Sequence, residues 1–219
     1  MSLRISDELK GSFPRLQVLA SRIMGVKVEM RSEELEGFKK EVIGRVKKEH
    51  ELGSLKDFPI FRAYRDFFWK VGIDPTKNRP AGEALIRRIL RDKQIPSINT
   101  LVDAYNLASI KTGIALAAFD ADKLEGDLLM RFAREGEKFL GIGMERPLEL
   151  KGGEVVISDG RKLVAVYPYR DSDETKVTSA TKDSLVLACG VPGIELKVLE
   201  KALRTAVDYI TQFCGGEVY

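Results

Sequence analysis

One stretch of the chain constrains its fold most, PSINTLVDAYNLASIKTGIALAAFD at residues 96–120. Ser97 or Asn99 can cap a helix here, because a short polar side chain accepts a hydrogen bond from a free helical N–H group. Gly113 suits the position just after a helix, where a positive φ is common. Residues 114–119 are small, apolar and uncharged, as is typical of a buried strand. The stretch therefore predicts a short helix followed by an interior strand.

Two polar residues of this helix, Asp103 and Asn106, are three positions apart and so share one face. One interpretation is structural, with both side chains bonding to neighbouring loops, because buried polar groups need partners. The other places one of them beside a ligand pocket. Both interpretations stay open at this point.

The hydrophobic periodicity predicts mostly helices before this stretch and mostly strands after it. Helices are expected from Ser32 onward, within residues 57–70, and over residues 81–93 and 194–213. In the first of them, Leu35, Phe38, Val42 and Val46 form the apolar stripe, and Lys39 lies outside it with other lysines. Strands are expected at residues 15–20, 27–30, 128–132, 138–142, 154–158, 162–167, 175–178 and 184–188, with hairpin turns at Glu135-Gly136 and, of type I′, at Asp159-Gly160.

This order of elements predicts an α+β fold, in which mostly antiparallel strands pack around a central helix. A helical, basic N-terminal region over residues 1–94 is expected to pack on a core formed by residues 95–219, and together they form one structural unit. The chain has 219 residues, enough to bury a core without disulfides. Cys189 and Cys214 have neither metal nor redox spacing.

Charge is distributed unevenly along the chain. Residues 1–95 contain 21 Lys and Arg against 14 Asp and Glu, whereas the rest of the chain is net acidic. Arg87, Arg88, Arg91 and Lys93 form the densest basic cluster and are candidates for RNA binding, because cationic side chains attract phosphate. The alternative is that they are the solvated face of a helix.

The aromatic residues at 57–70 also allow two interpretations. Phe61, Tyr64 and Phe68 recur at helical spacing, which predicts a stripe facing the core. Because Arg62 and Arg65 lie among them, the same segment could instead stack bases and bind phosphates. The core interpretation is favoured.

Several chemistries lack the residues that they need. The single histidine, His50, lies at the end of a lysine-rich helix, so a Ser-His-Asp or Cys-His mechanism has no base. There is no P-loop or dinucleotide-binding pattern, and we expect no cofactor and no metal. A magnesium site on Asp120, Asp122 and Asp127 is the alternative to simple solvation of that loop. Since no segment is apolar enough to be a signal peptide or a membrane span, the cytoplasm is the expected location.

The central stretch resembles a motif of the B3/B4 domain in the β subunit of phenylalanyl-tRNA synthetase. The matching positions are Asn99, Val102, Asp103, Asn106, Gly113, Ala118 and Asp120. Further matches are Gly126, Asp127 and Arg131, the Gly136-Glu137 pair, Tyr169-Arg170 and Thr181-Lys182. The resemblance covers residues 55–215 and implies an α+β domain associated with tRNA. It implies substrate-binding roles for Asn99, Asp103, Asn106, Asp120, Arg131, Glu137, Arg170 and Thr181, and it points to no catalytic residue.

In the synthetase this domain hydrolyses tyrosine that is wrongly attached to phenylalanine tRNA, so the resemblance implies an editing hydrolase that deacylates mischarged aminoacyl-tRNA. This chain departs from the motif at Ala117, where the family commonly has a histidine. Two alternatives therefore remain, a non-catalytic module that binds tRNA or a synthetase partner, and a pocket protein for a free amino acid. The expected partners are tRNA or aminoacyl-tRNA and not a membrane, and the oligomeric state is left open.

Overall fold

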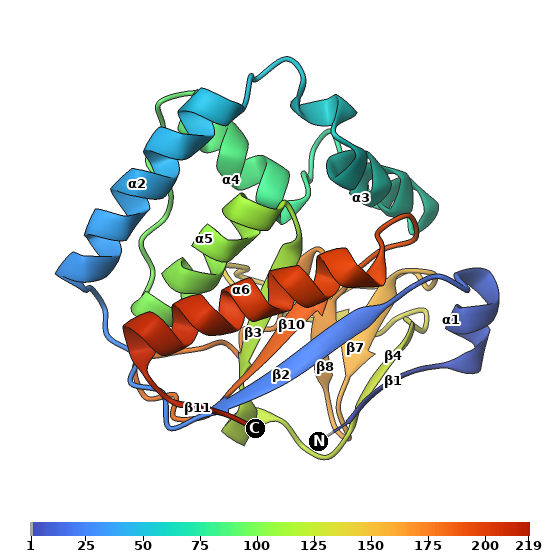
Figure 1. Cartoon of the computed structure of the whole chain (residues 1–219). Coiled ribbons are helices and arrows are strands. Elements are labelled where there is room, and N and C mark those ends of the chain that lie inside the picture. The colour runs from blue at the N-terminus through green and yellow to red at the C-terminus, as the bar shows by residue number, and fades with distance from the viewer. Residues whose placement is uncertain (1) are drawn as a thin grey trace.

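The computed structural model describes residues 2–219. Its helices are α1 (Asp7–Ser12), α2 (Glu33–Glu49), α3 (Pro59–Lys70), α4 (Ala81–Leu90), α5 (Thr100–Thr112) and α6 (Leu196–Cys214). Its strands are β1 (Leu3–Ile5), β2 (Val18–Met24), β3 (Ala115–Asp120), β4 (Leu128–Phe132), β5 (Lys138–Phe139), β6 (Leu148–Glu149), β7 (Val155–Ser158), β8 (Leu163–Val166), β9 (Arg170–Asp171), β10 (Ser184–Cys189) and β11 (Glu217–Val218). Helices α2–α6 gather on one side of the strands, where α6 packs across β2 and β10, and α1 lies at the edge of the strands beside β4 (Figure 1).

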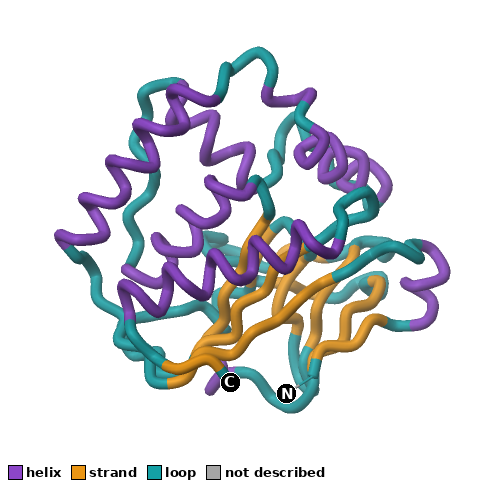
Figure 2. The backbone as a smooth tube through the Cα atoms, in the orientation of Figure 1, coloured by secondary structure: helices purple, strands orange, loops and turns teal. Residues whose placement is uncertain are grey.

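Two main sheets carry the fold. A five-stranded sheet has the order β1-β4-β7-β8-β9, and a four-stranded sheet has the order β11-β2-β10-β3. Among the described strands, only the β1–β4 pair is parallel, and every other pair is antiparallel. Figure 2 shows the strands of the two main sheets beneath α2–α6. The predicted α+β class with mostly antiparallel strands is confirmed.

The central helix of the prediction is α5. Its N-cap is Asn99, whose side chain accepts a hydrogen bond from the Val102 N–H group at 2.9 Å. It ends at Gly113, which adopts the left-handed conformation with φ 75°. Gly82 at the start of α4 approaches this turn so closely that an added Cβ would lie 2.9 Å from the Gly113 carbonyl oxygen. Thus α4 and the end of α5 meet through backbone, which only glycine permits.

The N-terminal region contributes strands to both sheets as well as helices. β1 pairs with β4 of one sheet, and β2 pairs with β10 at the centre of the other. The expected strand at residues 15–20 is shifted to Val18–Met24, and the strand expected at residues 27–30 is not formed. The aromatic stripe of α3 is buried as predicted, whereas Trp69 at its end is exposed.

Three further local predictions are wrong, each because a distant or side-chain partner decided the structure. β4 does not form a hairpin with β5, since β4 pairs with β1 and β7 and β5 pairs with β6. Between β7 and β8, the Asp159 carboxylate accepts hydrogen bonds from the N–H groups of Arg161 and Lys162, and neither Asp159 nor Gly160 has the positive φ of a type I′ turn. Residues 175–178 make only an isolated bridge between Lys176 and Phe119.

Within residues 2–219, no helix has both the length and the apolar character that crossing a bilayer requires.

Candidate functional site

A largely apolar cavity with a volume of about 230 Å³ lies where the two sheets meet α4 and α5. Its apolar walls come from β3, β7, β8 and β10, with Leu116, Ala117, Ile157, Val166 and Leu187 among the lining residues. Below the usual range for drug-sized ligands, this volume suits a small molecule or one chemical group of a larger one. We call this cavity the central pocket.

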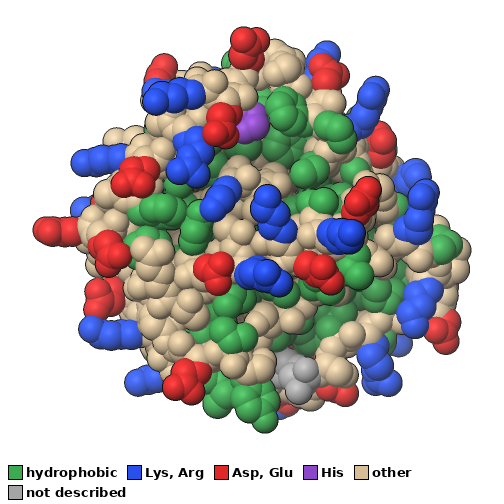
Figure 3. Space-filling model, in the orientation of Figure 1, with side chains coloured by type: hydrophobic (Ala, Val, Ile, Leu, Met, Phe, Trp, Pro, Cys, Tyr) green, Lys and Arg blue, Asp and Glu red, His purple; other side chains and the backbone are tan. Residues whose placement is uncertain are grey.

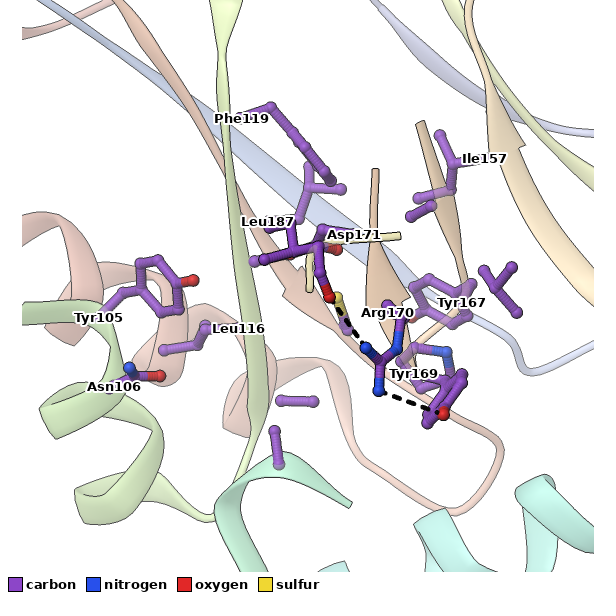
Figure 4. Close-up of a pocket in the computed structure, with 18 residues that line it drawn as sticks. Tyr105, Asn106, Leu116, Phe119, Ile157, Tyr167, Tyr169, Arg170, Asp171 and Leu187 are labelled. Carbon is purple, nitrogen blue, oxygen red and sulfur yellow. Dashed lines mark hydrogen bonds between the residues drawn. The ribbon is translucent and has the colours of Figure 1, made fainter. Parts of the chain in front are cut away.

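Polar groups enter the central pocket from two sides (Figure 4). On one side, α5 contributes Tyr105 and Asn106. On the other side, Arg170 comes from β9 and Tyr169 immediately precedes that strand. Asp171 lies between the two sides in this view. Burial raises the pKa of the Asp171 carboxyl to about 7. Burial also raises the pKa of the Tyr105 hydroxyl, with a smaller effect from the charge of Asp171, so the phenol stays neutral. The pocket thus combines apolar walls with a few polar groups, as small-ligand sites do.

Arg170 is held in place at this site. Its Nη1 donates a hydrogen bond to the Ile142 carbonyl oxygen at 2.9 Å, and its guanidinium carbon lies 5.1 Å from the centre of the Tyr169 ring. Gly141 allows this course, because an added Cβ there would lie 2.4 Å from the Arg170 Cδ atom. The guanidinium is therefore fixed by a carbonyl and an aromatic face and carries no carboxylate partner among residues 2–219.

The predicted substrate-binding residues do not form one site. Asn106 and Arg170 line the central pocket, and so does Ala117, which occupies the position of the family's histidine. Arg131 and Glu137 line a separate, polar hollow, where they form a two-pronged ion pair with distances of 2.8 and 2.7 Å. The hydrogen bonds from Arg131, assisted by the Arg134 N–H group and opposed by partial burial, lower the pKa of the Glu137 carboxyl.

The other four predicted residues are buried and bonded within the protein. Asn99 caps α5, and its amide also reaches the Val177 carbonyl oxygen at 3.4 Å. Asp103 lies 3.1 Å from the ammonium group of Lys39. Asp120 accepts a hydrogen bond of 2.8 Å from the Thr181 hydroxyl. These bonds position the elements around the pocket, and none of the four side chains lines it.

The predicted RNA-binding residues Arg87, Arg88, Arg91 and Lys93 line one hollow together with Lys77, Arg79 and Ala84, and we call it the basic groove. No acidic residue is among those that line this groove. Arg87 is neutralised by Glu83 at 2.7 Å, and Arg88 donates to the Gln94 carbonyl oxygen. Elsewhere the signs of charge are mixed, as on the face in Figure 3, where basic and acidic side chains lie among one another.

Asp171 and Tyr105 are the pocket residues that the sequence did not indicate. Asp171 is the second residue of the two-residue strand β9, which pairs with β8, and it shares the pocket with residues of α5 and β10 that are remote in the sequence. Tyr105 belongs to the helical pattern of α5, which does not distinguish a residue that lines a pocket from one that faces the core. The described residues contain no group of three or more His, Cys, Asp or Glu side chains arranged to hold a metal ion.

The fold defines an α+β domain with a pocket between its two main sheets. The family model described as "B3/4 domain" matches residues 63–215, and the chain therefore belongs to this family. The phenylalanine–tRNA ligase β subunit of Vibrio parahaemolyticus is 29% identical over 154 residues, which is 59% of this chain and 19% of that protein. That of Thermotoga maritima is 32% identical over 123 residues, or 56% of this chain and 16% of that protein.

A solved structure shares the overall fold. It is an N-terminal fragment of the phenylalanyl-tRNA synthetase β subunit from Pyrococcus horikoshii, with a TM-score of 0.56 and 13% sequence identity. The match covers 99% of this chain and 50% of that fragment. The chain spans only 19% of the length of the Vibrio ligase subunit, so the likeness concerns a domain of that enzyme.

Proposed function

We propose that this domain binds the aminoacylated end of a tRNA and hydrolyses the ester of a wrongly attached amino acid. One observation carries the proposal: α4 joins the central pocket to the basic groove. Ala81, the first residue of α4, lines the pocket, and Arg87 and Arg88 near its other end line the groove. The helix has 10 residues, and a helix of that size is about 15 Å long. An amino acid in the pocket would leave the attached RNA within reach of the groove.

The residues of the pocket are suited to positioning the ester. The Asn106 amide can both donate and accept a hydrogen bond, and the Arg170 guanidinium can meet a phosphate or a developing oxyanion. Hydrolysis then needs a water molecule held in line with the ester carbonyl, and holding the two reactants together supplies a large part of the rate enhancement. No side-chain nucleophile is required for this step.

The test is deacylation of a panel of mischarged tRNAs, starting with tyrosine on phenylalanine tRNA. Turnover by the wild-type protein, reduced in Asn106→Ala and Arg170→Ala and kept in the exposed control Arg146→Ala, is the expected result. Circular dichroism and unfolding midpoints show whether each variant is folded. If no mischarged tRNA loses its amino acid faster than in buffer alone, the hydrolase proposal fails.

A second candidate is a non-catalytic module that binds tRNA or a synthetase partner. Ala117 favours it, because the family's histidine is absent from the pocket, and His50 lies at the end of α2 against Phe58. Binding of tRNA that weakens steeply with salt and is not followed by turnover would select this candidate. A third candidate is a pocket for a free amino acid, which binding of the amino acid without any affinity for tRNA would select. The first two functions would place the protein in the cytoplasm with the translation machinery.

A further inference from the structure

The Asp171 carboxylate is the one acidic group that lines the central pocket, and it has no partner within residues 2–219. Its main-chain carbonyl accepts a hydrogen bond from the Ile142 N–H group at 2.9 Å, and its backbone pairs with Ala165 on β8. Its side chain, in contrast, accepts no hydrogen bond and forms no ion pair with any residue of 2–219. The side chain is partly buried, and a carboxylate that loses much of its hydration without gaining a donor is destabilising, so a ligand that supplies donors would stabilise it.

The groups that face Asp171 from the neighbouring elements do not neutralise it. Tyr105 on α5 and Cys189 on β10 both interact with its charge, and the pKa of each is raised above its ordinary range, mainly by burial. Both are therefore neutral near pH 7. Arg170, its neighbour in the chain, directs its guanidinium to the Ile142 carbonyl and the Tyr169 hydroxyl instead. The Asp171 carboxylate thus lies within apolar walls without a counter-ion of its own, although the Arg170 guanidinium lines the same pocket.

The unpaired Asp171 carboxylate favours some classes of ligand over others. An anion or a neutral group would leave the carboxylate desolvated, or would require it to take up a proton. A divalent metal would need several oxygen ligands, and the pocket lining offers a single carboxylate. An ammonium group supplies both the charge and the hydrogen-bond donors that the carboxylate lacks. The walls formed by Leu116, Ile157 and Leu187 suit an apolar body attached to that group.

We propose that the central pocket binds a primary ammonium group joined to an apolar side chain, with Asp171 as the counter-ion of the ammonium. Taken with the proposed function, on which this identification of the ligand rests, the ammonium is the α-amino group of the amino acid carried by the tRNA. Asp171 is then a binding residue that recognises the free, charged amino group. A blocked amino group, as in an N-acylated amino acid, would be rejected because it carries no charge.

The test uses small probes that keep their charge over the whole pH range. Binding of 3-methylbutylamine and 2-phenylethylamine is compared with that of 3-methylbutan-1-ol and 2-phenylethanol, in which a hydroxyl replaces the ammonium. Chemical shifts of backbone amides near the pocket report binding in the millimolar range. We expect each amine that fits to bind at least about tenfold more tightly than its alcohol, as for a hydrogen bond to a charged group.

Two variants distinguish a direct contact with Asp171 from the effect of any negative charge near the pocket. Asp171→Asn, which keeps the shape of the side chain, should bring the affinity for the amine down to that for the alcohol. Asp173→Asn is the matched control, because Asp173 lies two residues further, is paired with Lys176 at 2.7 Å and does not line the pocket. Its affinity for the amine should stay within about twofold of wild type.

The pH dependence of the wild-type protein gives an independent readout that needs no variant. The ligand-free Asp171 has a pKa of about 7, and the amine binds its ionised form. Amine affinity should therefore fall about tenfold per unit below that pH, with one proton released on binding, while alcohol affinity stays constant. Equal affinity for amine and alcohol, an unchanged Asp171→Asn variant, or no amine binding at all would each overturn the proposal. Failure of deacylation together with selective amine binding would instead reject only the proposed hydrolase.

Discussion

The ammonium group of Lys39 lies 3.1 Å from the Asp103 carboxylate, and both side chains are almost completely buried. Lys39 comes from the middle of α2, and Asp103 from the first turn of α5. The same ammonium group also donates to Glu36 at 2.7 Å and to the Ser97 hydroxyl at 2.8 Å, while Asp103 accepts a hydrogen bond from the Ile98 N–H group. The pair therefore fastens the start of the central helix to the N-terminal region.

This buried pair gives the first prediction. Lys39→Met should destabilise the protein by about 3–5 kcal/mol, because it leaves the Asp103 carboxylate buried without its counter-ion. Asp103→Asn should cost less, because Lys39 keeps its ion pair with Glu36. The free energy of unfolding in urea measures this cost. The matched control is Lys40→Met, since Lys40 is the next residue and is exposed. Destabilisation by Lys39→Met that is no larger than that by Lys40→Met would contradict the structural role.

The second prediction concerns Asp171 and pH. Its folded pKa of about 7 lies above the ordinary aspartate value of 3.8, so the folded state binds a proton that the unfolded state has already lost between these values. The contribution of Asp171 to stability is present below the unfolded pKa and is lost as pH rises through 7. Asp171→Asn should thus be more stable than wild type at about pH 8, by on the order of 2 kcal/mol, and this advantage should shrink as the pH falls and be lost at about pH 4, near the ordinary aspartate pKa. Urea unfolding at a series of pH values measures the difference, and parallel profiles would refute it.

The third prediction separates the polar hollow from the central pocket. Glu137→Gln removes a charge that is bonded to Arg131, and it should cost about 1 kcal/mol at neutral pH, since the pair is partly exposed to solvent. Because the pKa of Glu137 is lowered in the folded state, this contribution is present above the unfolded pKa and is lost as pH falls through the folded pKa. Amine binding to the central pocket should be unchanged. A large loss of amine affinity in this variant would show that the two sites are coupled.

The fourth prediction concerns the basic groove. Arg79, Arg91 and Lys93 are exposed and have no acidic partner within residues 2–219, so they are free to meet phosphates. Each replacement by alanine should weaken tRNA binding and lower the slope of log affinity against log salt by about 0.7–0.9. Fluorescence anisotropy over a range of salt concentrations measures the slope. Lys197→Ala, an exposed change on α6, serves as the control and should leave the slope as it is in wild type.

How well the sequence predicted an element depended on how far along the chain the residues that stabilise it lie. The ends of α5 were readable because Asn99 and Gly113 act on their own helix. Lys39 was expected among solvated lysines, and it is buried because its partner Asp103 comes from another helix. In the same way, β4 was assigned a neighbouring partner in the sequence, whereas it pairs with β1 and β7.

The candidate site followed the same rule. Asn106 and Arg170 were reached through the family motif, and they do line one pocket. The same family motif also predicted Arg131 and Glu137 as substrate-binding residues, but they line the separate polar hollow. No local pattern could indicate Asp171, since its unpaired state results from three elements that surround it without offering a donor.

The position of β10 has a consequence for how the protein is made. This strand comes near the end of the chain, yet it lies between β2 from the beginning and β3 from the middle, with all six residues buried. The four-stranded sheet therefore cannot close on the ribosome until most of the chain has emerged, and its strands must find each other over long stretches of sequence, which slows folding. Neither residues 1–94 nor residues 95–219 hold either of the two main sheets complete. Synthesised separately, the two pieces should stay unfolded, and they should regain structure only when they are mixed.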